Sequence, residues 1–407
     1  MRPQEINIEN YSYDLPGNRI AQYPVMQRDK SKLLVAGSEI KDDVFSNIAS
    51  YLPEDSLMVF NDTRVFHARM EFRKETGARI EIFLLEPLAP VTDTEQAFQQ
   101  TGSVVWKCLV GNLKKWKSGN LTTGFVVDGI NVEVSAARKG SEGNSQFIEF
   151  SWNTDMSFGS IVEEAGKIPL PPYMNRPAED ADAERYQTIY ARRDGSVAAP
   201  TAGLHFTPKV LQSLERKNIE TTFVTLDVGA GTFKPVKSER MAGHQMHTEK
   251  VYVSLETIRK LRQAKAGKKI IAVGTTTTRT LESLYWFGVK LTGNPDACFE
   301  IHQWEPYDYD SKDLPDADTA LQAVENHMID NDMDLLQGKT QVIIAPGYSY
   351  KIIDILITNF HQPKSTLLLL VAAFYGERWR EAYNYALTND FRFLSYGDSC
   401  LFIPPDK

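Results

Sequence analysis

A stretch of small and polar residues, 195–207, brings a histidine close to the start of a helix. Small side chains let a backbone approach a ligand closely. His205 precedes Thr207-Pro208, a pair typical of a helix N-cap followed by proline at the first helical position. Because the N-terminus of a helix suits a negative or strongly hydrogen-bonding group, the stretch is either a ligand-binding loop or a packed turn of small residues.

Two further segments share this design, in which polar residues follow an apolar strand and open a helix. Residues 274–278 offer backbone N–H groups and threonine hydroxyls to a carboxylate or phosphate, and Arg279 and Glu282 follow them. The segment lacks the lysine of a P-loop, which argues against nucleoside triphosphates. Asn359 and His361 border very apolar sequence, so they are either buried with hydrogen-bond partners or functional.

His244, His247 and Glu249 are residue types that bind metals, but their spacing is not that of a zinc motif. We therefore predict no metal, and acid–base chemistry, hydrogen bonding and plain surface polarity stay open for them. Gly229 and Gly231 follow a strand, as in a dinucleotide-binding loop. No helix with a third glycine comes next, which disfavours NAD and FAD.

Strands, loops and helices alternate over most of the chain, which is typical of an α/β domain. Apolar runs predict strands at 31–35, 56–61, 220–228, 268–273, 352–359, 391–394 and 400–403. Helical periodicity predicts helices at 42–52, 181–192, 208–217, 279–287 and 366–375. The acidic region 305–338 reads as mostly one surface helix with a solvated face.

Residues 65–156 have a different pattern, with period-two alternation and turns at short intervals. About six short strands without helices predict a small all-β barrel or sandwich. Because α/β patterning resumes afterwards, we expect this module to be inserted into a large α/β domain made of residues 1–64 and 157–407. Three prolines keep residues 167–173 extended, as a linker or a rigid wall.

Composition and charge bear on the cellular location of the protein and on its possible partners. The 407 residues have an ordinary globular composition and three widely separated cysteines, which favours a reducing, cytoplasmic location. No apolar run is long enough to cross a membrane. The net charge of −8 does not indicate a nucleic-acid partner, so any RNA contact needs local basic patches. Lys107 and the run Lys114, Lys115, Trp116 and Lys117 form one candidate, suited to a phosphate backbone and a stacked base, and Arg185, Arg192 and Arg193 could add to a basic surface.

Taken in order, these segments resemble the S-adenosylmethionine:tRNA ribosyltransferase-isomerases of queuosine biosynthesis. The resemblance covers nearly the whole chain, and ten groups of motifs carry it: Asp14-Leu-Pro with Ile20-Ala-Gln and Arg28-Asp29; Asn61-Asp-Thr-Arg64 with Ala68-Arg69; Ile168-Pro-Leu-Pro-Pro-Tyr173; Arg185-Tyr-Gln-Thr188; 195–207; Gly231-Thr-Phe with Pro235-Val236; 244–249; Val273-Gly-Thr-Thr276 with Arg279-Thr-Leu-Glu282; 357–361 with Ser365-Thr-Leu367; and 392–398. It implies a large α/β domain with an inserted small β-barrel. It also implies transfer of the ribosyl group of S-adenosylmethionine to 7-aminomethyl-7-deazaguanine at the tRNA wobble position, giving epoxyqueuosine, adenine and methionine.

On these motifs we expect the following roles. The acid–base candidates are His205, His247 and His361, and the carboxylates for the sulfonium or the acceptor amine are Glu249 and Asp398. S-adenosylmethionine, a co-substrate, would contact Thr201, Gly203, Thr275, Thr276, Arg279 and Asn359, with Thr275, Thr276 and Arg279 holding its methionine carboxylate or a phosphate. The partners are tRNA and S-adenosylmethionine, with no membrane, and a monomer is the default expectation.

Two positions depart from the family pattern. Asp227 stands where the family usually has a histidine, and Lys364 stands where it usually has a glutamate. The chain also carries extra sequence near 88–103 and 305–338. Two alternatives therefore stay open: a paralogue that uses S-adenosylmethionine on another acceptor, and a non-catalytic RNA-binding protein.

Overall fold

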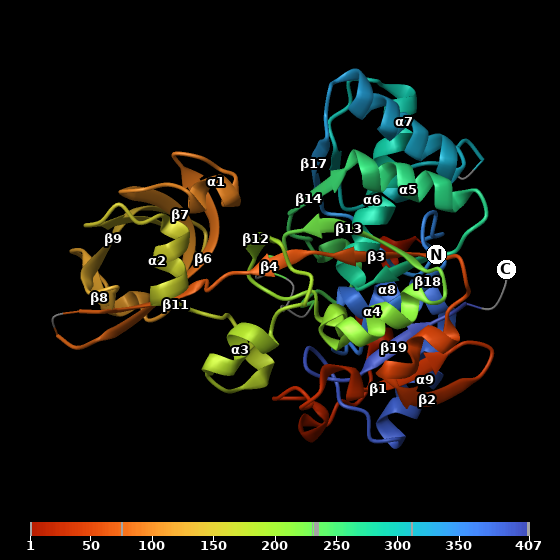
Figure 1. The fold of residues 1–407 in the computed structure, drawn as a ribbon, viewed down its shortest axis with the longest axis horizontal. Helices are drawn as coiled ribbons and strands as arrows, with labels where there is room; N and C mark the ends of the chain where they lie inside the picture. Colours follow the sequence, from red (N-terminus) through yellow and green to blue (C-terminus); the bar gives the residue numbers. More distant parts are fainter. Residues whose placement is uncertain (1, 75, 230, 232–235, 311, 405–407) are drawn as a thin grey trace.

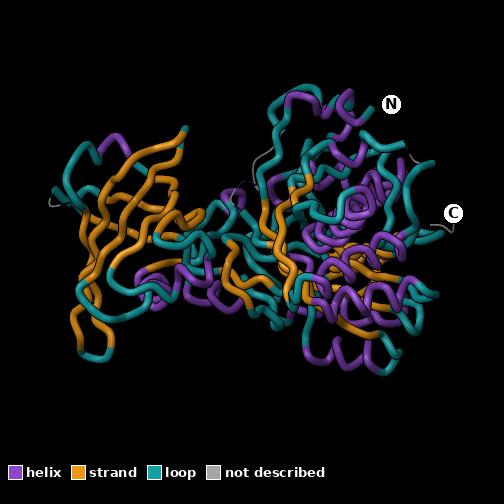
Figure 2. The backbone as a smooth tube through the Cα atoms, turned by 90° about the horizontal axis from the view of Figure 1, so that it is seen from above, coloured by secondary structure: helices purple, strands orange, loops and turns teal. Residues whose placement is uncertain are grey.

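The computed structural model describes residues 2–74, 76–229, 231, 236–310 and 312–404. They form a large α/β domain and a smaller β-barrel that lie side by side, joined by a narrower region of loops (Figures 1 and 2). The predicted fold class, a mixed α/β domain with an inserted small barrel, is confirmed. Among the described residues, no helix is both long and apolar enough to cross a bilayer.

A mixed sheet forms the centre of the large domain. Its strand order is β16-β17-β14-β13-β3-β15-β18-β19-β1-β2. The strands are β1 (Lys32–Ala36), β2 (Ile40–Val44), β3 (Leu57–Asn61), β13 (Glu220–Leu226), β14 (Glu249–Ser254), β15 (Ile270–Val273), β16 (Glu300–Ile301), β17 (Leu335–Thr340), β18 (Ile355–Asn359) and β19 (Ser399–Phe402). The central strands β13, β3, β15 and β18 run parallel to one another.

Helices cover both faces of this sheet, because successive side chains of a strand point to opposite sides. In β3, Leu57 and Val59 join one core, while Met58 and Phe60 join the other. The first core includes side chains of α5 (Leu255–Lys265), α6 (Thr275–Gly293), α7 (Ala317–Asp330), α8 (Thr366–Tyr375) and α9 (Trp379–Thr388). The second includes α4 (Pro208–Glu215) and the 3-10 helix Phe45–Tyr51. Strands buried on both faces read as near-continuous apolar runs, and this is why the sequence located them well.

The barrel closes because β5 pairs with both β6 and β8. Its six strands are β5 (Arg69–Arg73), β6 (Arg79–Ala89), β7 (Ser103–Val110), β8 (Leu121–Val127), β9 (Ile130–Glu142) and β10 (Ser145–Trp152). The expectation that it has no helix is wrong, since α1 (Thr94–Phe98) lies between β6 and β7. Asp93 caps α1, and Phe98 stacks on the buried Trp106. The barrel core also includes side chains of α2 (Phe158–Ala165), and β11 (Gly166–Lys167) pairs with β5.

A short parallel ribbon links the two bodies. It consists of β4 (Thr63–Val65), which leads into the barrel, and β12 (Arg193–Ser196). The segment 88–103 also touches the large domain, because Arg193 forms ion pairs with Asp93 and Glu95. The extra sequence there thus helps to attach the barrel.

Several predicted elements are shorter or different in type. Residues 42–52 are not one helix: 42–44 belong to β2, and Asp43 accepts hydrogen bonds from Val44 N and Asn47 Nδ2, so the helical turn begins only at Phe45. The helix predicted at 181–192 is only α3 (Asp180–Arg185). It ends there because the Gln187 amide bonds both the N–H and the carbonyl of Val65.

Three more predictions need correction. Residues 391–394 are not a strand: only Phe393 forms a bridge, and Leu394 has a φ of 70°. Residues 274–278 are not a loop, because α6 begins at Thr275 directly after Gly274, whose φ is 93°. In the acidic region, α7 is not only a solvated face, since Leu321 and Val324 are buried in the core.

Candidate active site

A cavity of about 90 Å³ lies beyond the carboxyl ends of the central parallel strands, and we call it the strand-end cavity. Such ends gather at one edge of a sheet and are the usual place for a ligand in α/β proteins. The cavity is lined by Tyr173, 198–202, Val228, 274–276, 358–362, Ser365, Leu367, Leu394 and Ser395. The three polar segments singled out in the sequence therefore converge on one cavity.

Two of the four threonines at the start of α6 border this cavity. They are Thr275 and Thr276, and Thr276 Oγ1 accepts a hydrogen bond from Asn61 Nδ2 at 3.1 Å. The hydroxyls of Thr277 and Thr278 instead donate to the carbonyls one turn back along the chain. Thr275 and Thr276 thus form part of the cavity wall. Thr277 and Thr278 use their hydroxyl groups in hydrogen bonds within the start of the helix.

The stretch 195–207 likewise contains residues that line the cavity and residues that only pack against the protein. Thr201 borders the strand-end cavity. Gly203 does not, and a Cβ there would lie 2.0 Å from Tyr190 Oη. The glycine lets the loop pack closely on Tyr190.

His361 borders the strand-end cavity and is only 8% exposed. Its Nε2 lies 3.3 Å from Thr358 Oγ1, and its Nδ1 lies 3.5 Å from Tyr383 Oη. Burial lowers the pKa of His361 to about 3, because an imidazolium loses its hydration there. The ring is therefore neutral at physiological pH.

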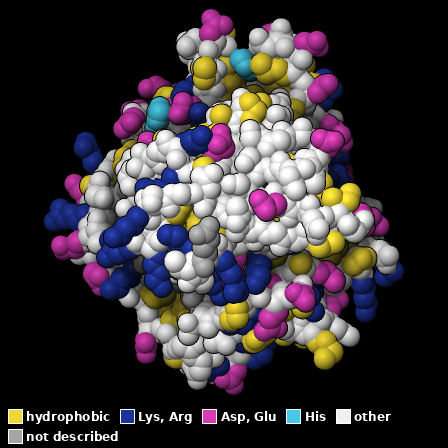
Figure 3. All heavy atoms as spheres, turned by 90° about the vertical axis from the view of Figure 1, so that its left-hand side faces the viewer, with side chains coloured by type: hydrophobic (Ala, Val, Ile, Leu, Met, Phe, Trp, Pro, Cys, Tyr) yellow, Lys and Arg dark blue, Asp and Glu magenta, His cyan; other side chains and the backbone are white. Residues whose placement is uncertain are grey.

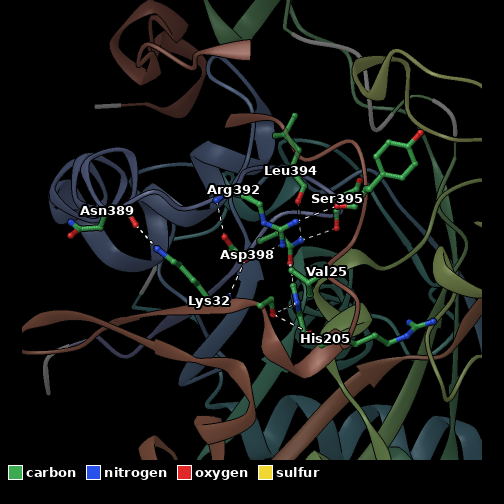
Figure 4. Close-up of polar contacts among 12 residues, drawn as sticks. Val25, Lys32, His205, Asn389, Arg392, Leu394, Ser395 and Asp398 are labelled. Atoms are coloured by element: carbon green, nitrogen blue, oxygen red, sulfur yellow. Dashed lines mark hydrogen bonds and ion pairs between the residues drawn. The ribbon is translucent and has the colours of Figure 1, made fainter. Parts of the chain in front are cut away.

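His205 lies behind the cavity wall, buried between two hydrogen-bonding partners (Figure 4). Its Nδ1 is 2.7 Å from Ser31 Oγ and its Nε2 is 3.0 Å from Asn359 Oδ1. Burial lowers the pKa of His205 to about 4, so the ring is neutral and carries one N–H. Asn359 Nδ2 donates to the carbonyls of Leu394 and Ser395, so Asn359 Oδ1 is an acceptor. His205 Nε2–H therefore donates to Asn359, and Nδ1 accepts from Ser31.

Asp398 holds the 392–398 turn and does not border the strand-end cavity. Its carboxylate accepts hydrogen bonds from Lys32 N at 3.0 Å and from Arg392 N at 2.8 Å, and it also pairs with the Arg392 guanidinium (Figure 4). The turn carries Leu394 and Ser395 to the strand-end cavity. Asp398 thus acts on the cavity through the backbone.

A second cavity, of about 160 Å³, lies beside Arg279, and we call it the Arg279 cavity. Arg279 forms a buried ion pair with Glu249, which in turn lies 3.2 Å from His247 Nε2. Burial alone would raise the pKa of Glu249, but Arg279 and His247 outweigh it and hold that pKa below its usual value. Glu249 is therefore a carboxylate that joins a guanidinium and an imidazole.

One group of Arg279 has no hydrogen-bond partner. Its Nε donates to the Val342 carbonyl and its Nη1 to Glu249, whereas Nη2 is buried without a partner in the described structure. An unsatisfied buried N–H costs free energy, typically about 1–3 kcal/mol. This atom is thus poised for an acceptor that enters the cavity.

The two cavities adjoin. Leu367 of α8 lines both, and the first two turns of α6 supply Thr275 and Thr276 to one and Arg279 to the other. An elongated ligand can therefore contact both. Residues 232–235, which include the Thr-Phe and Pro235 motif residues, lie outside the described part of the chain.

His244 lines the Arg279 cavity, and burial lowers its pKa. Across the described residues, no three His, Cys, Asp or Glu side chains come together as a metal site would require. The arrangement contains the groups for hydrogen bonding, anion binding and proton transfer.

The two departures from the family pattern lie outside both cavities. Burial raises the pKa of Asp227 to about 7, against the opposing effect of Arg193 and Lys250. A Cβ on Gly195 would lie 2.2 Å from Asp227 Oδ1, so the carboxylate packs directly on that glycine. Lys364 has a φ of 57° and forms an ion pair with Glu9 at 2.6 Å.

Sequence reasoning missed Tyr173 and Ser395 as cavity residues. They come from distant segments, and their hydroxyl groups form a hydrogen bond that closes one side of the strand-end cavity. A tyrosine at the end of a rigid proline run was the available signal. Tyr173 thus forms part of a wall, but the expectation that residues 167–173 are extended throughout is wrong, because Pro172–Met174 form a 3-10 helix.

The basic residues proposed for RNA contact have mixed surroundings. Trp116 is fully buried, so the expectation that it stacks on a base is wrong. Lys107 forms ion pairs with Glu86 and Glu142. Arg185 donates to the carbonyls of Val25 and Met26. Arg192 and Arg193 cover the rings of Phe223 and Tyr252.

Comparison with known proteins gives relatives along the whole chain. The model of a family described as "Queuosine biosynthesis protein" matches residues 8–402. The chain is 38% identical over 404 residues to the S-adenosylmethionine:tRNA ribosyltransferase-isomerase of Trichlorobacter lovleyi, covering 97% of this chain and 99% of that one. It is also 38% identical over 404 residues to the protein of that name from Halothermothrix orenii, covering 98% and 100%. A crystal structure of the S-adenosylmethionine tRNA ribosyltransferase of Thermotoga maritima aligns with a TM-score of 0.46 at 30% identity, over 97% of this chain and 99% of that one.

Proposed function

The chain belongs to the queuosine biosynthesis protein family, and on that premise we propose that it is an S-adenosylmethionine:tRNA ribosyltransferase-isomerase. It is an enzyme that uses S-adenosylmethionine as co-substrate and tRNA as acceptor. The ribosyl group passes to 7-aminomethyl-7-deazaguanine at the wobble position and isomerises, giving epoxyqueuosine-tRNA, adenine and methionine. The reaction takes place in the cytoplasm.

The Arg279 cavity takes the methionine end of the co-substrate. A carboxylate fits the unpartnered Arg279 Nη2, because guanidinium groups bind carboxylates through charge-assisted hydrogen bonds. Glu249 does not line the cavity, but it contacts Arg279 and His247, which do, and so supplies a nearby negative charge for the ammonium or the sulfonium. The apolar side chains Met246, Leu367 and Leu370 line the same cavity and suit the thioether carbons.

The strand-end cavity takes the nucleoside and the acceptor base. Thr275 and Thr276 at the N-terminus of α6 offer hydroxyl and backbone N–H groups. Thr201 and the Tyr173–Ser395 pair supply further polar contacts. Val228, Phe360 and Leu394 give the apolar surface that a heterocyclic ring needs.

Two histidines remain for proton transfer. His247, held by Glu249, removes the proton next to the sulfonium, since a carboxylate that pairs with an imidazole orients it and stabilises its protonated form. His361, neutral in the free protein, meets the departing adenine by hydrogen bonding. His205 and Asp398 position the walls of the strand-end cavity through Asn359 and the 392–398 turn.

The observation that carries this proposal is the near full-length match to two S-adenosylmethionine:tRNA ribosyltransferase-isomerases. The two adjoining cavities support it, because the co-substrate carries an anionic end and a heterocyclic end.

The deciding experiment incubates the protein with S-adenosylmethionine and a tRNA that carries 7-aminomethyl-7-deazaguanine. We expect free adenine, free methionine and a nucleoside of the mass of epoxyqueuosine. Adenine release with an unchanged tRNA would contradict the assigned acceptor, and no release would contradict catalysis. An Arg279→Lys variant should raise the KM for S-adenosylmethionine at least tenfold, because a lysine cannot keep the guanidinium contacts.

A further inference from the structure

Five cationic side chains stand together at one end of the barrel, and we call them the cationic rim. They are Lys74, Lys114, Lys115, Lys117 and Arg138. β6 is antiparallel to both β5 and β7, so the turns that follow β5 and β7 emerge at the same end. Two hydrogen bonds tie the rim together: Lys74 Nζ donates to the Lys115 carbonyl at 3.2 Å, and Arg138 Nη1 donates to the Trp116 carbonyl at 3.2 Å.

The charges of the rim are not neutralised within the described chain. Nearby cations do have acidic partners: Arg79 pairs with Glu71, Lys107 with Glu142, and Lys139 with Glu149. Among the described acidic residues, none lies in ion-pair contact with a rim side chain. Viewed from the barrel side, Lys and Arg side chains gather on one part of the face (Figure 3). The rim is thus a positive region on a protein of net charge −8.

The loop that carries three rim lysines is fixed in shape. Trp116 is fully buried in the barrel core, and its Nε1–H donates to the Gly119 carbonyl at 2.8 Å. Asn112, with a φ of 56°, donates from its side chain to the Arg79 carbonyl. Trp116 therefore anchors the loop, and Lys114, Lys115 and Lys117 are exposed around it. A surface held ready in this way loses little conformational entropy when it binds.

We propose that the cationic rim binds the phosphate backbone of the RNA substrate. This rests on the proposed function, which supplies an RNA acceptor. The rim presents lysine and arginine charges, and the one aromatic ring beside them, Trp116, is buried and cannot stack on a base. The rim therefore contacts the RNA backbone and not the faces of the bases. Because the net charge of −8 repels a polyanion overall, a local positive region such as the rim orients the RNA from outside the catalytic cavities.

The test compares two triple variants of the full chain. The rim variant carries Lys114→Gln, Lys115→Gln and Lys117→Gln. The matched control removes three exposed lysines of the large domain through Lys209→Gln, Lys312→Gln and Lys339→Gln. Both lose the same charge, and surface changes of this kind leave folding nearly unaffected, which thermal unfolding checks.

The measurements are the Kd for the tRNA that carries 7-aminomethyl-7-deazaguanine across a salt series, and the KM for both substrates. Neutralised phosphates release counterions, so losing three contacts should make the slope of log K against log salt shallower by about 2 to 3. We expect the rim variant to bind tRNA at least tenfold more weakly near 0.1 M salt, with an unchanged KM for S-adenosylmethionine, and the control to behave as the wild type. An unchanged slope in the rim variant, or an equal loss in the control, would overturn the proposal.

The same experiment separates this proposal from the function. If the wild type releases no adenine but its tRNA binding still depends on the rim, the function fails and the rim stands. If the wild type turns over and the rim variant keeps the wild-type KM for tRNA, the rim fails and the function stands.

Discussion

His205 Nε2 lies 3.0 Å from Asn359 Oδ1, and this bond joins the 3-10 turn Thr201–His205 to the end of β18. Both ring nitrogens of His205 are engaged, because Ser31 Oγ lies 2.7 Å from Nδ1. Asn359 in turn holds the carbonyls of Leu394 and Ser395, which belong to the wall of the strand-end cavity. His205 thus fixes the wall without touching its contents.

A positioning role for His205 predicts a graded response to substitution. We expect His205→Gln to keep kcat within about tenfold of wild type with the same pH–rate profile, because an amide can replace one or both hydrogen bonds. His205→Phe should lose substantially more, since it leaves Ser31 and Asn359 without partners. A pH–rate limb that disappears in His205→Gln would instead identify His205 as a proton-transfer group.

The buried histidines predict acid destabilisation. Burial lowers the pKa of His205 to about 4 and that of His361 to about 3, whereas an unfolded chain has values near 6.5. As the pH falls below 6.5, the unfolded state binds protons that the folded state does not, so the stability lost per histidine approaches about 1.4 kcal/mol per pH unit. Denaturant unfolding between pH 6.5 and 5 measures this loss.

The control for acid destabilisation is His302→Gln, at an exposed position, which should leave the slope unchanged. Replacing both His205 and His361 by Gln should flatten it. A slope that persists in the double variant would assign the effect to other groups.

The buried Asp227 predicts the opposite pH dependence of stability, with the free energy of unfolding falling as the pH rises. Burial raises its pKa to about 7, so its contribution to stability is present below about pH 4 and is lost as the pH rises through 7. Asp227→Asn removes the cost of the buried charge, and we expect the free energy of unfolding at pH 8 to rise by on the order of 1 kcal/mol. The same variant should steepen the loss below pH 6.5, because the opposing titration is gone.

The matched control for Asp227 is Asp296→Asn, an exposed carboxylate, which should change neither quantity. Equal stability of Asp227→Asn and wild type at pH 8 would mean that Arg193 and Lys250 keep this carboxylate charged at little cost.

Substitution of His247 should reduce catalysis, whereas substitution of Glu249 should reduce stability. His247→Gln should lower kcat by about 10² to 10⁴ with little change in thermal stability, because general acid–base catalysis contributes about that factor and the side chain is 32% exposed. Glu249→Gln should lower stability by several kcal/mol, because it leaves Arg279 charged, buried and without its ion-pair partner. If His247→Gln retains the wild-type kcat, the proposed base is wrong.

The fold was largely predictable because its signals are local. The apolar runs of β3, β15 and β18 are buried on both faces, and Thr207 caps α4 as its residue type suggested. The strand predicted at 391–394 is wrong because the chain bends there. Leu394 has a φ of 70°, and the Asp398 carboxylate accepts a hydrogen bond from Arg392 N. No local pattern in the sequence reveals such a bend.

The candidate site was predictable only in part, because chain distance hides the partners. The segments around Thr275, Asn359 and His361 could be found from their polar residues beside apolar strands. The sequence could not show that Asn359 is held by His205, 154 residues away, or that Tyr173 meets Ser395. The same limit applies to Trp116, since a tryptophan between lysines looks the same whether it is exposed or plugs a barrel.

The pairing of β1 with β19 has a consequence for the order of folding. Lys32 N and Asp398 Oδ1 are joined across a separation of 366 residues, while the barrel strands pair mainly with near neighbours in the chain. Contacts between distant residues form late, because closing a long loop costs entropy before any contact repays it. During synthesis the barrel, with its rim, can therefore be complete while the catalytic sheet still waits for its last strand. The ability to hold an RNA backbone then arises before the ability to modify it.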